Sequence, residues 1–297
     1  MMAFLPKLAH AAAIASLLVL AAPACSAAGQ AAGAFPDGAK VAAIGGSLTE
    51  IVYALGEEGR LVARDSTSVY PEAALKLPDV GYMRQLSPEG VLSVNPGGVL
   101  ALEGSGPREA VEVLKKAGIP YIEVPESFDH QGILAKIHAV GKALGAEEKA
   151  DALADAVDAR LKSAESRTAS VKERKRVLFV LSLQGGKILA AGDHTAADGI
   201  IRLAGAVNAV EGYSGYKQLT DEAVLTASPD IVLMMDRGGA PDGAVDPFEN
   251  AAIAATPAGV NRTLIRMDGA YLLGFGPRTA EAIHDLAASI YGQQADN

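Results

Sequence analysis

The sequence has little of several residue types on which common sites depend. Its 297 residues include one cysteine, no tryptophan and five histidines, and aromatic residues make up 5%. Disulfide scaffolds, iron–sulfur clusters and structural zinc sites need several cysteines or a Cys/His cluster, so the composition excludes them. Basic side chains are also in the minority, with 26 against 35 acidic ones and a net charge of -9. Nucleic acid is therefore disfavoured as the main partner, because phosphate binding needs a basic face.

The sequence also lacks the motifs of common enzyme classes. It holds no GxSxG nucleophile elbow, no P-loop and no HExxH motif. Two Gly-x-Gly segments, at 104–106 and 274–276, lack the third glycine of a dinucleotide-binding turn, and each is followed by proline. We therefore expect a protein without enzymatic activity, and an enzyme is the first rival hypothesis.

Residues 1–28 have the features of an export signal peptide. Lys7 is the only charged side chain before Asp37, and an apolar run follows it at 11–22. This run is shorter than the roughly 20 residues that a membrane span needs. A cleaved signal peptide is therefore favoured over a membrane anchor that is kept.

The single cysteine, Cys25, lies among small residues at the end of this segment. Cleavage after Ala24 or after Ala28 would satisfy the small-x-small rule. A cysteine at the first mature position could carry lipid, but Pro23 makes a poor lipoprotein signal. We expect Cys25 to be lost with the signal peptide or left unmodified. A mature chain with almost no cysteine suits an oxidising compartment.

The rest of the chain alternates short apolar runs with helical segments, which is typical of parallel α/β sheets. The run 40–44 ends at two glycines, and Ser47 and Glu50 then stand in the S-x-x-E order of a capping box that would open a helix. The length exceeds one comfortable core, which favours two lobes. Further strands are expected at 98–102, 121–124, 176–181 and 230–235, and helices at 108–117 and 132–144.

A segment without glycine or proline, 146–175, predicts one long helix between two lobes at 38–145 and 176–295. Leu153, Val157 and Leu161 recur at helical spacing within it. A helix of roughly 25–28 residues would be about 40 Å long and could act as a stiff strut. An ordinary domain helix with one solvated face would show the same spacing, so that alternative stays open.

An internal repeat supports two related lobes. Residues 85–101 align without gaps to 218–234, with eight of 17 positions identical. Glu89 and Glu222 occupy matching positions, each early in an expected helix, where acidic residues suit the helix dipole. The first lobe carries an insertion at about 63–83 that the second lacks. Extra material in one of two paired lobes is a reasonable place to look for a ligand site.

Tyr82 and Arg84 stand at the end of this insertion. In an extended segment, residues i and i+2 project to the same side, so both could contact one ligand. A phenolate is a hard oxygen ligand for ferric iron, and a neighbouring guanidinium favours the phenolate. On spacing alone, a surface loop with a satisfied hydroxyl is the commoner explanation of Tyr-x-Arg.

Four segments closely resemble the periplasmic haem-binding proteins of bacterial ABC importers. They are GYMRQLSPEGVLSVNP, AAGDHTAADGIIRLAGAVNAV, VLMMDRGG and YLLGFGPRTAEAI. The resemblance covers nearly all of the chain after the signal peptide, in order, and GYMRQLS is its most specific segment. It implies an α/β fold of two Rossmann-like α/β lobes joined by a single long rigid α-helix, with a ligand cleft between the lobes. Cobalamin, siderophore and metal-ion carriers share this framework.

The resemblance also implies the residues that hold the haem. Tyr82 matches the axial iron ligand, and Arg84 matches the arginine that hydrogen-bonds its oxygen. Arg237, in the MMDRG stretch, matches an arginine that reaches the haem edge. Tyr271 and Arg278 are further cleft candidates. Haem carries two propionates, which explains cationic side chains at the cleft of an acidic protein.

Some relatives use a histidine of the second lobe as another axial ligand or to hold a second haem, near the end of the strand after the long helix. The present sequence has Leu-Ser-Leu-Gln at 181–184, which favours one haem with a single protein ligand. His194 is a substitute candidate, although a helix-start residue beside the Thr195 cap explains it as well. The histidines at 130, 138 and 284 are scattered, which does not suggest a zinc or manganese carrier.

The resemblance finally implies a partner and a task. Such proteins dock on a two-fold permease through one acidic residue in each lobe, which would be Glu89 and Glu222; simple helix capping is the alternative. The expected function is to bind ferric haem in the periplasm, as a monomer, and to deliver it to an inner-membrane ABC transporter. A periplasmic carrier of cobalamin or a ferric siderophore is the alternative, although low aromatic content argues against a cleft of stacked rings.

Overall fold

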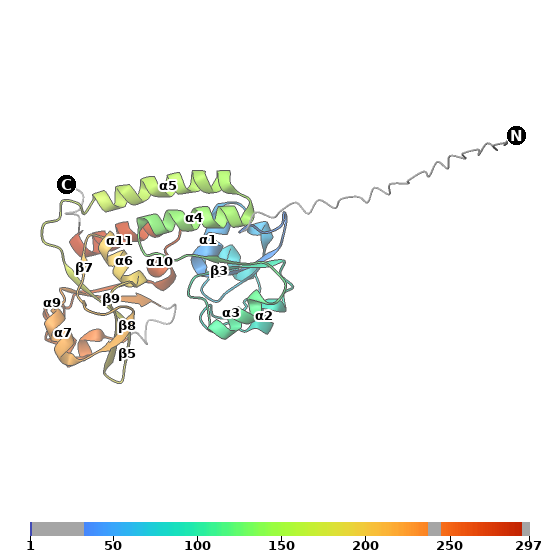
Figure 1. Cartoon of the computed structure of the whole chain (residues 1–297). Coiled ribbons are helices and arrows are strands. Elements are labelled where there is room, and N and C mark those ends of the chain that lie inside the picture. The colour runs from blue at the N-terminus through green and yellow to red at the C-terminus, as the bar shows by residue number, and fades with distance from the viewer. Residues whose placement is uncertain (2–32, 237–244, 293–297) are drawn as a thin grey trace.

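Two α/β lobes lie side by side in the computed structural model, beneath helices that run along one side of both (Figure 1). The structure describes Met1 and residues 33–236 and 245–292. The expected signal peptide and Cys25 otherwise lie outside these residues, so the structure does not test them. Within the described residues, no helix has both the length and the apolar character needed to cross a bilayer.

The N-terminal lobe is built on four parallel strands in the order β2-β1-β3-β4. The central strands β1 and β3 are buried at every position, as their apolar sequences predict. β2 was not expected, because this short strand ends in a charged residue. The strands are β1 Val41–Ile44, β2 Leu61–Arg64, β3 Gly98–Leu102 and β4 Tyr121–Val124, and the helices are α1 Gly46–Ala54, η1 Glu58–Arg60, η2 Glu72–Lys76, α2 Pro88–Leu92 and α3 Arg108–Lys115.

The C-terminal lobe has a mixed sheet in the order β10-β9-β5-β6-β8, with β7 paired to β5. It departs from the expected parallel plan because Gly185 and Gly186, both at positive φ, fold β6 directly back on β5 as a hairpin. The strands are β5 Arg176–Gln184, β6 Lys187–Ala191, β7 Val207–Asn208, β8 Tyr216–Leu219, β9 Ile231–Asp236 and β10 Leu264–Asp268, and the helices are α6 Ala196–Leu203, α7 Asp221–Ala227, η4 Pro247–Glu249, α8 Ala251–Ala254, α9 Pro257–Asn261, α10 Gly269–Leu273 and α11 Thr279–Tyr291.

The predicted capping box at the start of α1 is not formed. Gly45 is the residue before the helix and Ser47 lies inside it, without a side-chain cap. The cap comes instead from the segment after β2: the Gly45 N–H donates to Asp65 Oδ1 at 3.0 Å and the Gly46 N–H donates to Thr67 Oγ1 at 3.0 Å. Non-local side chains satisfy these first amides.

Two helices connect the lobes, α4 (His130–Leu144) and α5 (Glu147–Ser166), with the left-handed Gly145 ending α4. α5 packs on α4 and on α11, so it spans both lobes (Figure 1). With 20 residues, α5 is about 30 Å long, shorter than the expected 25–28 residues. The chain continues beyond Ser166 as turns, in which the buried Thr168 packs against Gly205 of the C-terminal lobe.

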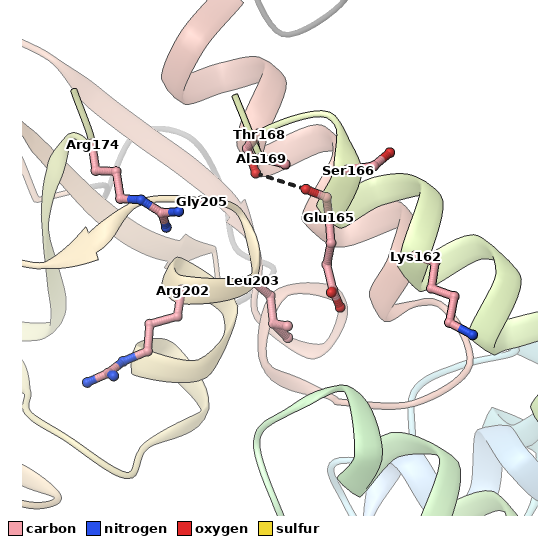
Figure 2. Close-up of a pocket in the computed structure, with 9 residues that line it drawn as sticks. All are labelled: Lys162, Glu165, Ser166, Thr168, Ala169, Arg174, Arg202, Leu203 and Gly205. Carbon is pink, nitrogen blue, oxygen red and sulfur yellow. Dashed lines mark hydrogen bonds between the residues drawn. The ribbon is translucent and has the colours of Figure 1, made fainter. Parts of the chain in front are cut away.

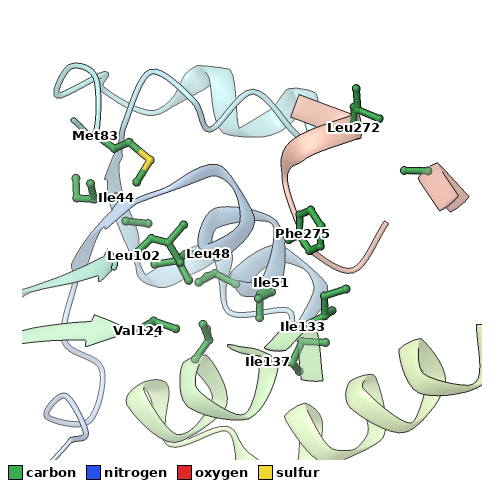
Figure 3. Close-up of a cluster of buried hydrophobic side chains, with 14 of the residues drawn as sticks. Ile44, Leu48, Ile51, Met83, Leu102, Val124, Ile133, Ile137, Leu272 and Phe275 are labelled. Carbon is green, nitrogen blue, oxygen red and sulfur yellow. The ribbon is translucent and has the colours of Figure 1, made fainter. Parts of the chain in front are cut away.

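One hydrophobic core runs through both lobes. It joins β1 and β3 of the first lobe to α4, α5, α11 and the helix-facing side of the second sheet, while a second cluster fills the other side of that sheet. Figure 3 shows Phe275 of the C-terminal lobe turned toward the helices that carry Ile51 and Ile133. Close-packed interiors resist sliding, so this shared core favours a stable arrangement of the lobes.

Gly141→Ala is expected to destabilise the α4–α5 pair. Gly141 is buried, and a Cβ there would overlap the Cβ of Ala150 on α5. Overpacking of this kind costs about 1–3 kcal/mol, which urea denaturation of the mature protein would measure. Gly59→Ala is the matched control, since a Cβ at Gly59 meets nothing within 4 Å. Equal stability of the two variants would contradict the close helix contact.

Candidate functional site

Tyr82, Met83 and Arg84 form a turn at the end of the insertion. The Gln85 N–H donates to the Tyr82 carbonyl at 2.8 Å, so the segment is a β-turn, and the expected extended conformation is wrong. Met83 is buried and its carbonyl accepts from Gly106 N–H at 2.8 Å. Tyr82, at 43% exposure, and Arg84 are both accessible on either side of this buried anchor.

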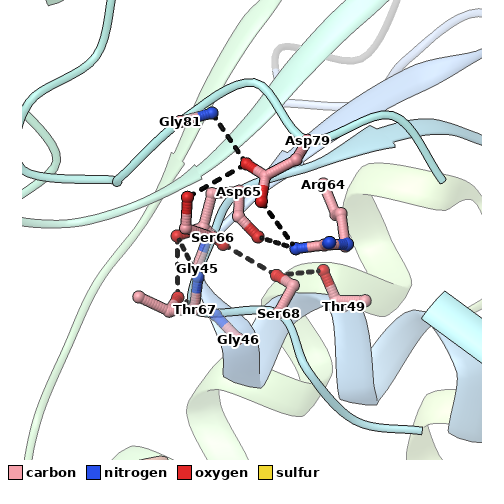
Figure 4. A network of polar contacts seen from close by, with 10 residues as sticks. All are labelled: Gly45, Gly46, Thr49, Arg64, Asp65, Ser66, Thr67, Ser68, Asp79 and Gly81. Carbon is pink, nitrogen blue, oxygen red and sulfur yellow. Dashed lines mark hydrogen bonds and ion pairs between the residues drawn. The ribbon is translucent and has the colours of Figure 1, made fainter. Parts of the chain in front are cut away.

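The chain just before Tyr82 is held by a polar network centred on Asp79 (Figure 4). Its carboxylate accepts from the Gly81 N–H at 2.8 Å, from Ser66 Oγ at 3.0 Å and from Arg64 Nη1 at 3.1 Å. Gly81 has φ of 97°, a conformation that side chains rarely adopt. These hydrogen bonds of Asp79 therefore fix the position of the turn that carries Tyr82.

A second carboxylate, Asp65, ties the same segment to the start of α1. It is fully buried and accepts from Ser68 Oγ and from Thr67 Oγ1, each at 2.7 Å, as well as from Gly45. Buried carboxylates persist only when such donors surround them. The insertion is thus fastened to the carboxyl edge of the first sheet, where ligands of parallel sheets gather.

Tyr216 of β8, in the C-terminal lobe, lies within electrostatic reach of this turn. It is 37% exposed and pairs with Ala191 of β6. Burial raises the pKa of the Tyr216 phenol above its ordinary value, while the positive charge of Arg84 and a hydrogen bond with Thr195 act in the opposite direction. The phenol of Tyr82 is also near enough to influence it. Side chains of both lobes therefore lie within electrostatic reach of one another here.

The sequence analysis did not identify Tyr216, although the internal repeat contains a match between Tyr216 and Tyr82. The gapless alignment starts at Gln85 and Gln218, and a one-residue gap extends it to Gly81-Tyr82 and Gly215-Tyr216. The two tyrosines then occupy related positions in the two lobes. The shorter loop in the second lobe conceals this match from a gapless comparison.

A buried ion pair, Lys136 with Glu126, lies within electrostatic reach of Arg84. Lys136 Nζ is 2.6 Å from Glu126 Oε1 and also donates to the Phe275 carbonyl at 3.0 Å and to Ser47 Oγ at 3.3 Å. Burial raises the pKa of Glu126, which the charges of Lys136 and Arg84 oppose. Burial likewise lowers the pKa of Lys136, which Glu126 opposes.

Tyr271 and Arg278 lie together, but their polar groups already have partners. Arg278 Nε donates to Glu50 Oε2 at 3.0 Å, and the guanidinium lies 3.5 Å from the ring centroid of Tyr70 and 5.4 Å from that of Tyr271. The Tyr271 hydroxyl donates to Asp285 at 3.0 Å. Burial and this carboxylate raise the pKa of Tyr271. Arg237 lies outside the described residues.

His194 directly precedes the Thr195 cap of α6, as one of the two interpretations expected. It has φ of 58°, is exposed, and its Nδ1 lies 3.1 Å from Ser214 Oγ. Tyr82, Arg84 and Tyr216 together are called the tyrosine site. Because Thr195 hydrogen-bonds with Tyr216, His194 lies one residue from this site. The position of His194 beside the helix cap does not test its role as a haem ligand, which stays a prediction.

Glu89 and Glu222 are exposed in the first turns of α2 and α7. Backbone hydrogen bonds at these helix starts, with Ser87 and Thr220 as caps, lower the pKa of each carboxyl. Both side chains are therefore ionised. In Figure 1, α2 and α7 lie on the side of the molecule opposite α5. The two carboxylates stand at equivalent places in the two lobes.

A surface pocket of about 430 Å³ lies elsewhere, at the carboxyl end of α6 (Figure 2). Lys162, Arg174 and Arg202 line it together with Glu165. It is at the opposite end of α6 from Thr195 and is thus separate from the tyrosine site. Among the described residues, no three His, Cys, Asp or Glu side chains group as metal ligands.

Two α/β lobes connected by the helices α4 and α5 define the class of two-lobed solute-binding proteins. The chain belongs to the periplasmic binding protein family, whose family model matches residues 41–271. The class and the family agree with the fold that the sequence resemblance implied.

The proteins to which the chain is similar include binding proteins for different ligands. A solved structure of the periplasmic haem-binding protein BhuT with two haems shares 40% identity and a TM-score of 0.80, covering 87% of this chain and 98% of that one. The uncharacterized ABC transporter substrate-binding lipoprotein YvrC of Bacillus subtilis is 29% identical over 85% of this chain and 80% of its own length. The vitamin B12-binding protein of Yersinia pestis is 25% identical, covering 66% and 69%.

Lys136→Met is expected to destabilise the protein by about 3–5 kcal/mol at pH 7, because Glu126 keeps a buried charge without its partner. The double variant Glu126→Gln, Lys136→Met should recover much of the loss, measured by chemical denaturation. Burial raises the pKa of Glu126 in the folded state. As the pH falls, the folded protein therefore takes up a proton on Glu126 before the unfolded chain does, and the unpaired buried charge is removed. The deficit of Lys136→Met should therefore shrink as the pH falls. A deficit that grows on acidification would contradict the buried pair.

Proposed function

We propose that this protein binds ferric haem in the periplasm and delivers it to an inner-membrane ABC transporter, without catalysing a reaction. The observation that carries the proposal is the accessible Tyr82–Arg84 turn, which is held by Asp79 and lies within electrostatic reach of Tyr216 of the other lobe. The 40% identity to a haem-binding protein over most of both chains supports the same ligand.

The chemistry of the site suits this ligand. The Tyr82 oxygen is a hard ligand that ferric haem iron accepts in the axial position. Arg84 stabilises that oxygen as a hydrogen-bond donor, and Tyr216 meets the porphyrin from the C-terminal lobe. Haem is mostly apolar, and the insertion exposes Val69 and Leu75, at 42% and 48%. Arg237 serves the propionates as a cation.

Tyr82→Phe tests the ligand by removing a single oxygen atom. Titration of the purified mature protein with ferric haemin should saturate near one equivalent and give a high-spin, tyrosinate-type visible spectrum. We expect Tyr82→Phe to lose that spectrum and to weaken haemin binding by at least roughly tenfold, because the iron–oxygen bond is gone.

Tyr53→Phe is the matched control, since Tyr53 lies near the end of α1, at the opposite edge of the sheet from the turn. This variant should bind like the wild type. An unchanged spectrum in Tyr82→Phe would overturn the assignment of Tyr82 as the axial ligand.

A cobalamin carrier is the second candidate, favoured by the similarity to a vitamin B12-binding protein. The identity is lower there, and the match covers less of the chain than the haem-binding match does. A corrin already holds its cobalt ligands, so it would not depend on the Tyr82 oxygen. Saturable binding of cyanocobalamin, equal in wild type and Tyr82→Phe, would favour this function over haem.

The transporter is proposed to receive the protein, as a monomer, through Glu89 and Glu222. Both carboxylates are exposed and ionised, and one comes from each lobe, as a two-fold permease requires. Export by the signal peptide at 1–28 places the protein beside such a permease.

The double variant Glu89→Ala, Glu222→Ala should lose most haem uptake in vesicles that contain the purified transporter. Haemin binding should not change, because neither residue lies at the tyrosine site. The control Glu147→Ala, Glu148→Ala removes two exposed carboxylates from α5, on the opposite side of the molecule, and should transport normally. Normal uptake by the first variant would refute the docking role.

A further inference from the structure

We propose that Arg278 is a positioning residue that holds the two lobes in register through Glu50, rather than a residue that contacts the ligand. Its effect on haem rests on the proposed function, but the contact itself does not. Glu50 belongs to α1 of the N-terminal lobe, and Arg278 precedes α11 of the C-terminal lobe, 228 positions further along the chain.

Glu50 and Arg278 make a directional contact that uses three donors. The Arg278 backbone N–H donates to Oε1 at 3.0 Å, and Nε and Nη2 each lie 3.0 Å from Oε2. The side chains are only 10% and 26% exposed, so solvent screens the pair less than a surface ion pair. A guanidinium held by two nitrogens is fixed in orientation as well as in place. The Nε–Nη2 edge of the guanidinium is thereby engaged by Glu50.

The face of the same guanidinium holds the insertion. Tyr70 stacks on it, with its ring centroid 3.5 Å from Cζ of Arg278. Tyr271 lies on the guanidinium as well, at 5.4 Å. Arg278 therefore links α1, the insertion that leads to Tyr82, and α10 at one point. Planar stacking of this kind is available to arginine and not to lysine.

The loop before Arg278 adds two further ties across the boundary. Lys136 donates to the Phe275 carbonyl at 3.0 Å, and the Phe275 ring meets Phe128 edge-on at 5.2 Å. Gly276 permits the approach, because a Cβ there would lie 3.3 Å from the Glu50 carboxyl. The loop 275–278 is thus an interlobe joint, built from an ion pair, a buried cation and an aromatic contact.

The consequence is that Glu50 should matter to ligand binding as much as Arg278 does. If Arg278 acted by touching the ligand, loss of Glu50 would leave its cationic side chain present and freer to bind. If it acts through the joint, either loss releases the same contact, and removing both residues adds little.

Interlobe distances test this directly. Spin labels at Val113→Cys and Val260→Cys, exposed by 50% and 75% on the two lobes, report the distance distribution in the mature protein with Cys25 replaced by serine. In the ligand-free protein, Glu50→Gln and Arg278→Gln should each broaden that distribution. Each should weaken haemin binding by roughly three- to tenfold, and the double variant should be no worse than either.

Arg160→Gln is the matched control, because the Arg160–Glu281 pair has the same chemistry but is 45% and 44% exposed. Arg160→Gln should change neither the interlobe distance distribution nor the affinity for haemin. Arg278→Lys, which keeps the charge and loses the fork, should broaden the distribution to a smaller extent and serves if the glutamine variants do not fold. Distributions as narrow as in the wild type, with weakened binding in Arg278→Gln only, would overturn the proposal and make Arg278 a ligand contact. If the wild type itself does not bind haemin, the proposed function fails, and the ligand-free distances still decide whether the joint exists.

Discussion

A buried lysine that reaches across the lobe boundary constrains how the two halves of the molecule can sit. Removing an ammonium group from water costs several kcal/mol unless partners replace the solvent. For Lys136 these partners come from three parts of the chain: Glu126 after β4, Ser47 in α1 and the Phe275 carbonyl of the C-terminal lobe. Moving the second lobe away would leave the cation partly unsatisfied. The arrangement is therefore held by a desolvation penalty as well as by the continuous apolar core around Phe275.

The same constraint extends to the candidate site. Glu126 lies within the electrostatic reach of both Lys136 and Arg84, so the charge balance of the joint and that of the site are linked. The Tyr82 turn is braced independently by Asp79 and by the buried Met83. A ligand at the turn would thus meet groups already in place, and less of the binding free energy would be used to order them. Preorganisation of this kind favours capture of a rigid, flat ligand.

Local patterns predicted much of the framework, because apolar runs and helix spacing reflect contacts between near neighbours. Strands β3 and β4 coincide with the expected residues, and the repeat placed Glu89 and Glu222 correctly in helix starts. The wrong predictions concern residues whose partners are distant in the sequence. The capping-box interpretation of Glu50 was wrong because Asp65 and Thr67 supply the cap, which leaves Glu50 to bind Arg278. Tyr216 was missed because the shorter loop of the second lobe conceals its match to Tyr82 from a gapless comparison.

Tyr216 and the interlobe joint lie toward opposite edges of the second sheet. In the second sheet the order is β10-β9-β5-β6-β8, so β8 is one edge strand and β10 the other. The joint at 275–278 follows β10 and α10, whereas Tyr216 lies on β8, which pairs with β6 alone. An edge strand can shift with fewer broken hydrogen bonds than a central strand. Tyr216 therefore stands on the less constrained edge of the second sheet, away from the strand that leads into the contacts of Lys136 and Arg278.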